Sequence, residues 1–243
     1  YELFLDEKGE KISKSKGNGI TMEEWLNYAS PESLSLYMYQ NPQRAKKLYS
    51  DVVPKAVDEY LSLIEKFPGQ DKKDQLSNSV WHVHNGEPPK EKVVMSFSML
   101  LNLVGSSNTD DKKILWKFIN RFHKNVSPKS NPILDSLTER AIKFFKDKLK
   151  PKKLYKTPNE LEKKALSNVA LKIQKINEDM PPEEIQTIVY SVGKENGYEK
   201  NLRDWFKLIY QVLFGDIDGP RIGFFISFFG VQETIKLIKD KIN

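Results

Sequence analysis

The stretch that decides the fold class reads NPILDSLTERAIKFFKDKL and covers residues 131–149. It begins with an Asn-Pro pair, and proline is favoured at the first position of an α-helix because its missing N–H is not needed there. Apolar residues then recur every three or four positions, at Leu134, Leu137, Ala141 and Phe144. This is the period of a helix that buries one face, so the stretch predicts an amphipathic helix.

The same pattern recurs along most of the chain, often behind a proline. Ser30-Pro31, Thr157-Pro158 and Pro181-Pro182 mark three further helix starts. The connections are short, which places neighbouring helices antiparallel in a bundle. The predicted fold class is therefore mainly α, a helical bundle preceded by a short β-hairpin and loop. Apolar spacings predict the other helices near residues 31–40, 53–64, 97–104, 114–119, 157–176, 185–192, 202–213 and 231–238, with Leu161 on the apolar face of the helix at 157–176. The polar, proline-containing residues 68–92 predict an extended connector.

Composition limits the function classes. A chain of 243 residues with 39% hydrophobic residues is long and apolar enough to bury a core in one large or two small domains. No apolar run approaches the ~18 residues that a membrane-spanning helix needs. The absence of cysteine excludes disulfides, cysteine–zinc sites and thiol catalysis. A net charge of +6 is modest and says little about partners.

Residues 1–30 differ from the rest of the chain. The apolar residues around Phe4 and Ile12, on either side of a turn at Gly9, predict two very short strands. Behind a polar loop, Thr21 is predicted to cap a short helix with Trp25 and Leu26 on its apolar side.

The loop itself reads KISKSKGN, residues 11–18, and is called the lysine loop below. Lys11 and Lys14 lie three residues apart and can converge on a polyphosphate, where ammonium groups offset negative charge. The loop contains no His, Asp or Glu, so it offers no general base, and its chemistry is electrostatic stabilisation at phosphorus. Composition alone also allows a basic surface loop without such a role. We expect the loop to be mobile, because no apolar residue holds positions 13–18.

A resemblance favours the first interpretation. Lys11-Ile12-Ser13-Lys14-Ser15 resembles the K-M-S-K-S signature loop of class I aminoacyl-tRNA synthetases, with Ile12 in the place of Met. The residues that follow are similar to class I lysyl-tRNA synthetases, densely up to residue 67 and in patches to residue 243. The similar segments are residues 17–19, 24–26, 30–34, 41–48, 58–61, 82–86 and 219–223.

The resemblance implies an activity and roles for loop residues. Such enzymes activate lysine with ATP, with Mg²⁺ expected in the full enzyme, and transfer the lysyl group to tRNA-Lys in the cytoplasm. Lys14 corresponds to the lysine that contacts the ATP phosphates in the transition state, and Lys11 supports it electrostatically. Ser13 and Ser15 correspond to residues that shape the loop and bind the ATP phosphates.

One family signature is missing. The H-I-G-H motif that binds ATP from the Rossmann domain has only a superficial echo in residues 82–85, and the chain has neither G-x-G-x-x-G nor a strand–helix alternation. We therefore expect the Rossmann catalytic domain to be absent from this chain, the chain to be the carboxy-terminal portion of such an enzyme, and residues 1–243 alone to be inactive in lysine activation.

The resemblance also predicts three functional segments. Residues 1–67 form the signature-loop and stem-contact segment, residues 68–125 a helical connector, and residues 126–243 an α-helical anticodon-binding bundle.

Four cationic residues are candidates for RNA contacts. Arg221 stands at a predicted helix start, where N–H groups also attract phosphate, and Arg203 lies on the helix before it. Lys152 and Lys153 lie in the densest basic stretch and are candidates for the tRNA backbone. A structural salt bridge at Arg221 and a solvated helix end at the lysines are the alternative readings. Trp205, by its spacing, is assigned to the core.

The three histidines, His82, His84 and His123, lack acidic partners at ligand spacing, so we predict no metal site. Two other functions stay open. One is a non-catalytic tRNA-binding helical module, against which the lysine loop argues. The other is a class I synthetase for another amino acid, since lysine specificity rests on the resemblance alone.

Overall fold

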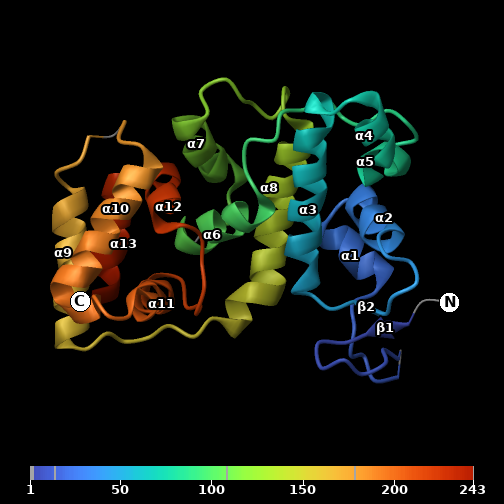
Figure 1. Cartoon of the computed structure of the whole chain (residues 1–243). Helices are drawn as coiled ribbons and strands as arrows, with labels where there is room; N and C mark the ends of the chain where they lie inside the picture. Colours follow the sequence, from blue (N-terminus) through green and yellow to red (C-terminus); the bar gives the residue numbers. More distant parts are fainter. Residues whose placement is uncertain (1–2, 14, 108, 178, 243) are drawn as a thin grey trace. The chain divides into compact units, whose positions relative to one another are not determined.

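The computed structural model describes residues 3–13, 15–107, 109–177 and 179–242, which are mainly α-helical, as predicted (Figure 1). Contacts divide the chain into two compact units. The first comprises Tyr1–Leu101 and Val126–Lys148, and the second Asn102–Asn125 and Leu149–Asn243. The functional segments 1–67, 68–125 and 126–243 stay predictions. Within the described part of the chain, no helix is both long and apolar enough to cross a membrane.

The first unit begins with a minimal sheet. Strand β1 (Phe4–Leu5) pairs in parallel with β2 (Lys46–Lys47). The predicted hairpin is reduced to one antiparallel bridge between Leu5 and Lys11. Strand β2 was not predicted, because two consecutive lysines show no alternation of apolar and polar residues.

Two short helices follow the lysine loop. Helix α1 (Met22–Tyr28) is capped by Thr21 as predicted, since the side chain of Thr21 accepts a hydrogen bond from the Glu24 N–H. Helix α2 (Pro31–Tyr39) is capped by Ser30 in the same way. Trp25 is fully buried, but Leu26 is 42% exposed, so its predicted apolar placement was wrong. A helix of two turns buries one narrow face, and Trp25 occupies it.

The next helices run from α3 (Val52–Lys66) through the 3₁₀ turn η1 (Phe67–Gly69) to α4 (Lys72–Ser77) and α5 (Ser79–Val83). Residues 68–92 were expected to be an extended connector, and the two helices at 72–83 correct that. Their sequence signals are the caps Asp71 and Asn78, whose side chains accept hydrogen bonds from the Asp74 and Val80 N–H groups.

Helix α8 (Pro132–Phe144) starts at the predicted proline and continues as a π-helical segment, η2 (Phe145–Leu149). Its first N–H groups, on Ile133 and Leu134, donate to the carboxylate of Glu91 at 2.7 and 3.0 Å. Helix α6 (Phe97–Ser107) contains the boundary between the units. The core of the first unit includes Trp25, Leu36, Val57, Leu61, Ile64, Phe97, Leu100, Leu137 and Phe144.

The second unit contains α7 (Lys112–Phe122), α9 (Glu160–Ile173), α10 (Pro182–Gly193), η4 (Lys194–Tyr198), α11 (Leu202–Leu213), α12 (Ile222–Phe229) and α13 (Val231–Ile242). Helix α9 starts later than predicted, because Asn159 and Glu162 form a capping box in place of the expected Thr157-Pro158 start. Leu161 was expected on the apolar face but is 80% exposed in the first turn.

Trp205 is fully buried, as predicted, between α11 and α10. Its Nε1–H donates to the Val189 carbonyl at 2.9 Å. A Cβ at Gly193 would lie 2.5 Å from the indole, so only glycine allows this approach. The core around it includes Leu166, Val169, Ile173, Ile185, Val192, Ile209, Val212, Phe225, Ile226 and Ile238.

Candidate functional site

Asn18 closes the lysine loop. Its Oδ1 accepts a hydrogen bond from the Ser13 N–H at 3.1 Å. Its Nδ2 donates to the Lys11 carbonyl at 3.3 Å and to Asp6 Oδ2 at 2.8 Å. One carboxamide therefore joins the two ends of the loop and fastens both to Asp6. The expectation of mobility took only apolar contacts into account and not these polar ones, and the mobility of the loop stays a prediction.

Within the loop the backbone forms a turn. The N–H groups of Lys16 and Gly17 donate to the Ser13 carbonyl at 3.2 and 3.1 Å, and Gly17 adopts a positive φ of 58°. The hydroxyls of Ser13 and Ser15 lie 3.3 Å apart. The structure thus brings the two predicted serines together on one turn.

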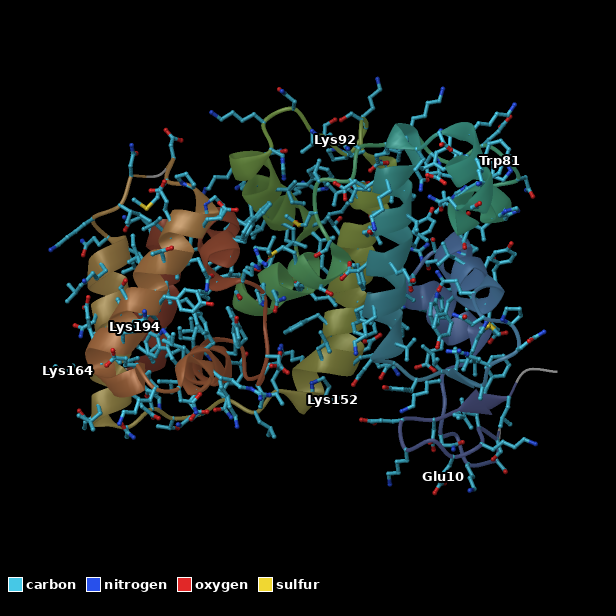
Figure 2. The ribbon with its side chains drawn as sticks, in the orientation of Figure 1. Glu10, Trp81, Lys92, Lys152, Lys164 and Lys194 are labelled. Atoms are coloured by element: carbon cyan, nitrogen blue, oxygen red, sulfur yellow. The ribbon has the colours of Figure 1, made fainter. Side chains whose placement is uncertain are left out.

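The lysines of the loop have different surroundings. Lys11 is exposed and has no ion-pair partner in the part of the chain that the structure describes. Lys16 lies 3.6 Å from Glu10, which Figure 2 labels, and both side chains are exposed. Lys14, the predicted catalytic residue, lies outside the described residues.

Asp6 is the functional candidate that the sequence reasoning missed. It is only 7% exposed, yet its Oδ1 accepts from the Lys8 and Glu10 N–H groups at 2.9 and 2.8 Å. The hydrogen bond from Asn18, followed by that from the Glu10 N–H, lowers the pKa of Asp6 below its ordinary value. An available signal was an aspartate three residues before Gly9, the pattern of a turn held by a carboxylate.

The flanks of the lysine loop are attached to the segment that contains β2. The Lys46 and Leu48 N–H groups donate to the Leu3 and Leu5 carbonyls, and the Ile20 N–H donates to the Leu48 carbonyl. Ile12 packs so closely on Gly19 that a Cβ there would lie 2.5 Å from the Ile12 side chain. The residue in the place of the family's Met is thus an apolar anchor.

A second candidate lies in the second unit, on α10, α11 and the start of α12. It is a hollow of about 680 Å³, called the α11 hollow below. The structure brings both predicted arginines, Arg203 and Arg221, to its lining, whereas neither Lys152 nor Lys153 lines it. The complete lining is Gln186, Tyr190, Asn201, Arg203, Asp204, Phe206, Lys207, Tyr210, Ile217, Asp218, Gly219 and Arg221.

The cations of the α11 hollow are exposed. Arg203 and Lys207 lie one turn apart on α11, and Arg221 is the N-cap residue of α12. Within the described ranges, none of the three side chains has a hydrogen-bond or ion-pair partner, so the salt bridge considered for Arg221 is not seen there. Cations without protein partners beside a hollow are available to an anion.

Aromatic side chains form the wall. Tyr190 and Phe206 meet edge to face with ring centroids 4.8 Å apart, and Tyr190 is 40% exposed. The hydroxyl of Tyr210 donates to the Pro220 carbonyl at 2.8 Å, and burial raises the pKa of Tyr210 to about 12, so it stays protonated. A Cβ at Gly219 would lie 2.6 Å from the Tyr210 ring. Tyr210 therefore holds the loop that carries Arg221.

The basic stretch of the second unit is different. Lys153 forms an ion pair with Asp216 and its side chain is only 9% exposed, while Lys156 forms one with Glu162. Lys152, labelled in Figure 2, is exposed in the short 3₁₀ segment η3 (Lys150–Lys152).

The histidines are engaged in other contacts. His84 Nε2 lies 2.9 Å from the Tyr60 hydroxyl, His82 Nε2 lies 2.8 Å from the Leu76 carbonyl, and the His123 ring lies 5.6 Å from that of Phe228. Among the residues with described positions, no group of three or more His, Asp or Glu side chains is arranged to hold a metal.

The sequence of this chain is similar to that of known proteins. The family model described as tRNA synthetases class I (K) matches residues 1–87. The chain is 47% identical over 238 residues to the lysine–tRNA ligase of Roseobacter denitrificans, covering 98% of this chain and 45% of that protein. It is 47% identical over 244 residues to the lysine–tRNA ligase of Rickettsia bellii, covering 100% of this chain and 47% of that protein.

The chain thus spans about half the length of the curated relatives that it matches. The identity extends from the lysine loop through both units to the last helices. This similarity supports the interpretation of the chain as a region of a class I lysyl-tRNA synthetase.

Proposed function

We propose that this chain is part of a cytoplasmic lysine–tRNA ligase. The enzyme joins lysine and ATP to form lysyl-adenylate and pyrophosphate, and then transfers the lysyl group to tRNA-Lys. The observation that carries the proposal is the lysine loop, in which Ser13, Lys16 and Gly17 form a turn, in a chain that is 47% identical to the lysine–tRNA ligase of Roseobacter denitrificans. The substrates are therefore ATP, with Mg²⁺, lysine and tRNA-Lys.

The loop acts electrostatically. Lys14 is the residue that stabilises the charge developing on the ATP phosphates, Lys11 adds to the positive field, and Ser13 and Ser15 shape the turn and face the phosphates. Because this stabilisation is greatest when charge peaks in the transition state, it raises turnover more than it raises affinity for ATP.

Lysine-dependent exchange of pyrophosphate into ATP by the full-length enzyme tests this role. Lys14→Ala is expected to lower kcat roughly 100-fold while the KM for ATP changes about twofold or less. Lys16→Ala is the matched control, since it removes a lysine from the same loop that already faces Glu10. Equal losses in the two variants would show a general effect of positive charge and contradict the assignment to Lys14.

We further propose that residues 1–243 alone do not activate lysine. In the described residues the sheet consists of two strands of two residues each, which cannot form a nucleotide-binding α/β fold. The test is the same exchange assay on residues 1–243. Exchange above a lysine-free control would refute this part of the proposal.

The second unit is proposed to bind tRNA-Lys at the α11 hollow. Arg203 and Arg221 contact backbone phosphates, and the exposed ring of Tyr190 offers a surface on which an unpaired base can stack. Lys152 and Lys153 form a second proposed phosphate contact. That contact is energetically weaker at Lys153, because a phosphate must displace Asp216 from it.

Binding of tRNA-Lys, measured by fluorescence anisotropy at several salt concentrations, tests the tRNA contacts. A linear fall of log affinity with log salt is expected, as for any contact that releases counterions. Affinity that does not depend on salt would contradict phosphate contacts at these residues.

A further inference from the structure

We propose that Asp6 and Asn18 are positioning residues for the lysine loop: the Asp6 carboxylate orients the Asn18 carboxamide, and that carboxamide holds the loop backbone at Lys11 and Ser13. The proposal rests on the proposed function of the loop. Neither residue is assigned contact with a substrate, and both act through the backbone that carries the lysines.

The hydrogen bonds of Asp6 are divided between two tasks. Its Oδ1 accepts from two backbone N–H groups, those of Lys8 and Glu10, which fixes the carboxylate in the turn around Gly9. Its Oδ2 faces Asn18 Nδ2 at 2.8 Å. With one oxygen anchored to the backbone, the other has one direction in which to point, and that direction determines the orientation of the carboxamide.

Asn18 uses both ends of its side chain. The oxygen accepts from the Ser13 N–H, and the amide nitrogen donates to Asp6 and to the Lys11 carbonyl. An aspartate at this position has no donor, and an aliphatic residue has neither donor nor acceptor. The position therefore requires a group that accepts on one side and donates on the other.

The charge of the Asp6 carboxylate is better explained by its contact with Asn18 than by a contact with ATP. A carboxylate beside a loop that faces polyphosphate repels the ligand, so its charge does not serve ATP binding. Asp6 is also 93% shielded from solvent, an arrangement that is unfavourable for an ion unless hydrogen bonds compensate it. Three N–H groups from Lys8, Glu10 and Asn18 provide this compensation.

The consequence for catalysis follows from preorganisation. A loop whose ends are already joined loses less conformational entropy when its lysines meet the phosphates. Loss of the Asn18 contacts is therefore expected to slow activation while ground-state affinity for ATP changes little.

An exchange of the two side chains in the full-length ligase tests the proposal. Asn18→Asp places two carboxylates face to face, and we expect kcat for lysine-dependent pyrophosphate exchange to fall roughly 10- to 100-fold, with the KM for ATP changed about threefold or less. The double variant Asp6→Asn with Asn18→Asp restores one N–H to carboxylate contact with its direction reversed. Because Asn18→Asp still removes the donor to the Lys11 carbonyl, we expect this variant to recover only part of the lost activity, with a kcat about threefold or more above that of Asn18→Asp alone.

Glu10→Gln is the matched control. It removes one negative charge from the same turn and breaks only the exposed contact with Lys16, so kcat is expected to stay within about twofold of wild type. A loss as large as that of Asn18→Asp would show that charge near the loop, and not the hydrogen bond, determines the rate, and would overturn the proposal.

The remaining outcomes separate the two proposals. If the wild-type enzyme shows no lysine-dependent exchange, the proposed function is wrong. If the wild type is active and Asn18→Asp keeps its kcat, the positioning role is wrong. Should the single variants lose thermal stability as well as activity, the double variant decides: recovery of kcat supports the proposal, and a kcat no better than that of the single variants overturns it.

Discussion

Two groups of cations in the second unit differ in what surrounds them. Lys153 and Lys156 lie in the densest basic stretch of the sequence, and each forms an ion pair, with Asp216 and Glu162 respectively. Arg203, Lys207 and Arg221 are sparse in the sequence, but they line one hollow and have no such partner in the described part of the unit. The density of positive charge along a chain is therefore a poorer guide to a binding surface than whether each cation already forms an ion pair with a carboxylate.

The difference has an energetic basis. A lysine that already neutralises a carboxylate must give up that partner to bind a phosphate, so the exchange yields little free energy. An unpaired arginine forms a new charge-assisted hydrogen bond and releases counterions from the nucleic acid. RNA binding is therefore expected to depend on the α11 hollow.

The largest effect is expected from removing both arginines. Arg203→Ala with Arg221→Ala should lower affinity for tRNA-Lys roughly 100-fold, since a hydrogen bond to a charged group contributes about 1.5 kcal/mol or more. The slope of log affinity against log salt should fall by about two, one for each phosphate contact. Fluorescence anisotropy at several salt concentrations measures both. An equal loss of tRNA affinity in the double variant Lys153→Met with Lys156→Met would contradict the expected difference between the paired lysines and the unpaired arginines.

The next effect concerns stacking and not charge. Tyr190→Ala is expected to lower tRNA affinity about tenfold, because stacking of a base on an aromatic ring contributes about 1–3 kcal/mol. The salt slope should stay unchanged, since no charge is removed. Tyr190→Phe keeps the ring and should bind like wild type. If Tyr190→Ala also binds like wild type, the hollow contacts phosphates alone.

A smaller effect is expected on stability. Lys153→Met keeps the apolar stem of the side chain but leaves Asp216 without its cation, and should lower the free energy of unfolding by about 1 kcal/mol. Urea denaturation measures the change. Affinity for tRNA should change about twofold or less. A large loss of affinity with unchanged stability would show that the proposed phosphate contact of Lys153 is strong and that its ion pair with Asp216 does not weaken it.

The smallest effect is a dependence on pH. Burial raises the pKa of Glu162, but hydrogen bonds from Lys156 and the Asn159 N–H outweigh it, and the pKa lies below the ordinary value of 4.5. A carboxylate with a lowered pKa stabilises the fold at neutral pH, and this contribution is lost as the pH falls below that value. Glu162→Gln should therefore be less stable than wild type by a few tenths of a kcal/mol at neutral pH. A difference in urea midpoint between Glu162→Gln and wild type that persists in acid would contradict this prediction.

Much of the fold could be predicted because helix starts and apolar spacing are local signals. Pro132 and Pro182 begin the helices expected of them, and Trp205 is in the core. Leu26 and Leu161 were misplaced because apolar spacing alone does not tell which residues of a first or short turn face the core. Residues 72–83 were missed because their two helices, of six and five residues, are too short to show an apolar period.

The candidate sites could be predicted only in part. The lysine loop is contiguous, so its residues were found from the sequence. The role of Asp6 depends on a contact with Asn18, twelve positions away, and no local pattern shows that contact. Arg203 and Arg221 were identified separately, but that they line one hollow follows from the turn between α11 and α12, which Tyr210 holds through Pro220.

The parallel pairing of β1 with β2 has a practical consequence for anyone who wishes to study the loop in isolation. Parallel strands cannot be joined by a tight turn, so a crossover carrying α1 and α2 separates Leu5 from Lys46. A synthetic peptide of the first twenty residues would lack the backbone partners supplied by Lys46 and Leu48. A minimal autonomous version of the loop must therefore extend at least through Leu48 and include both intervening helices.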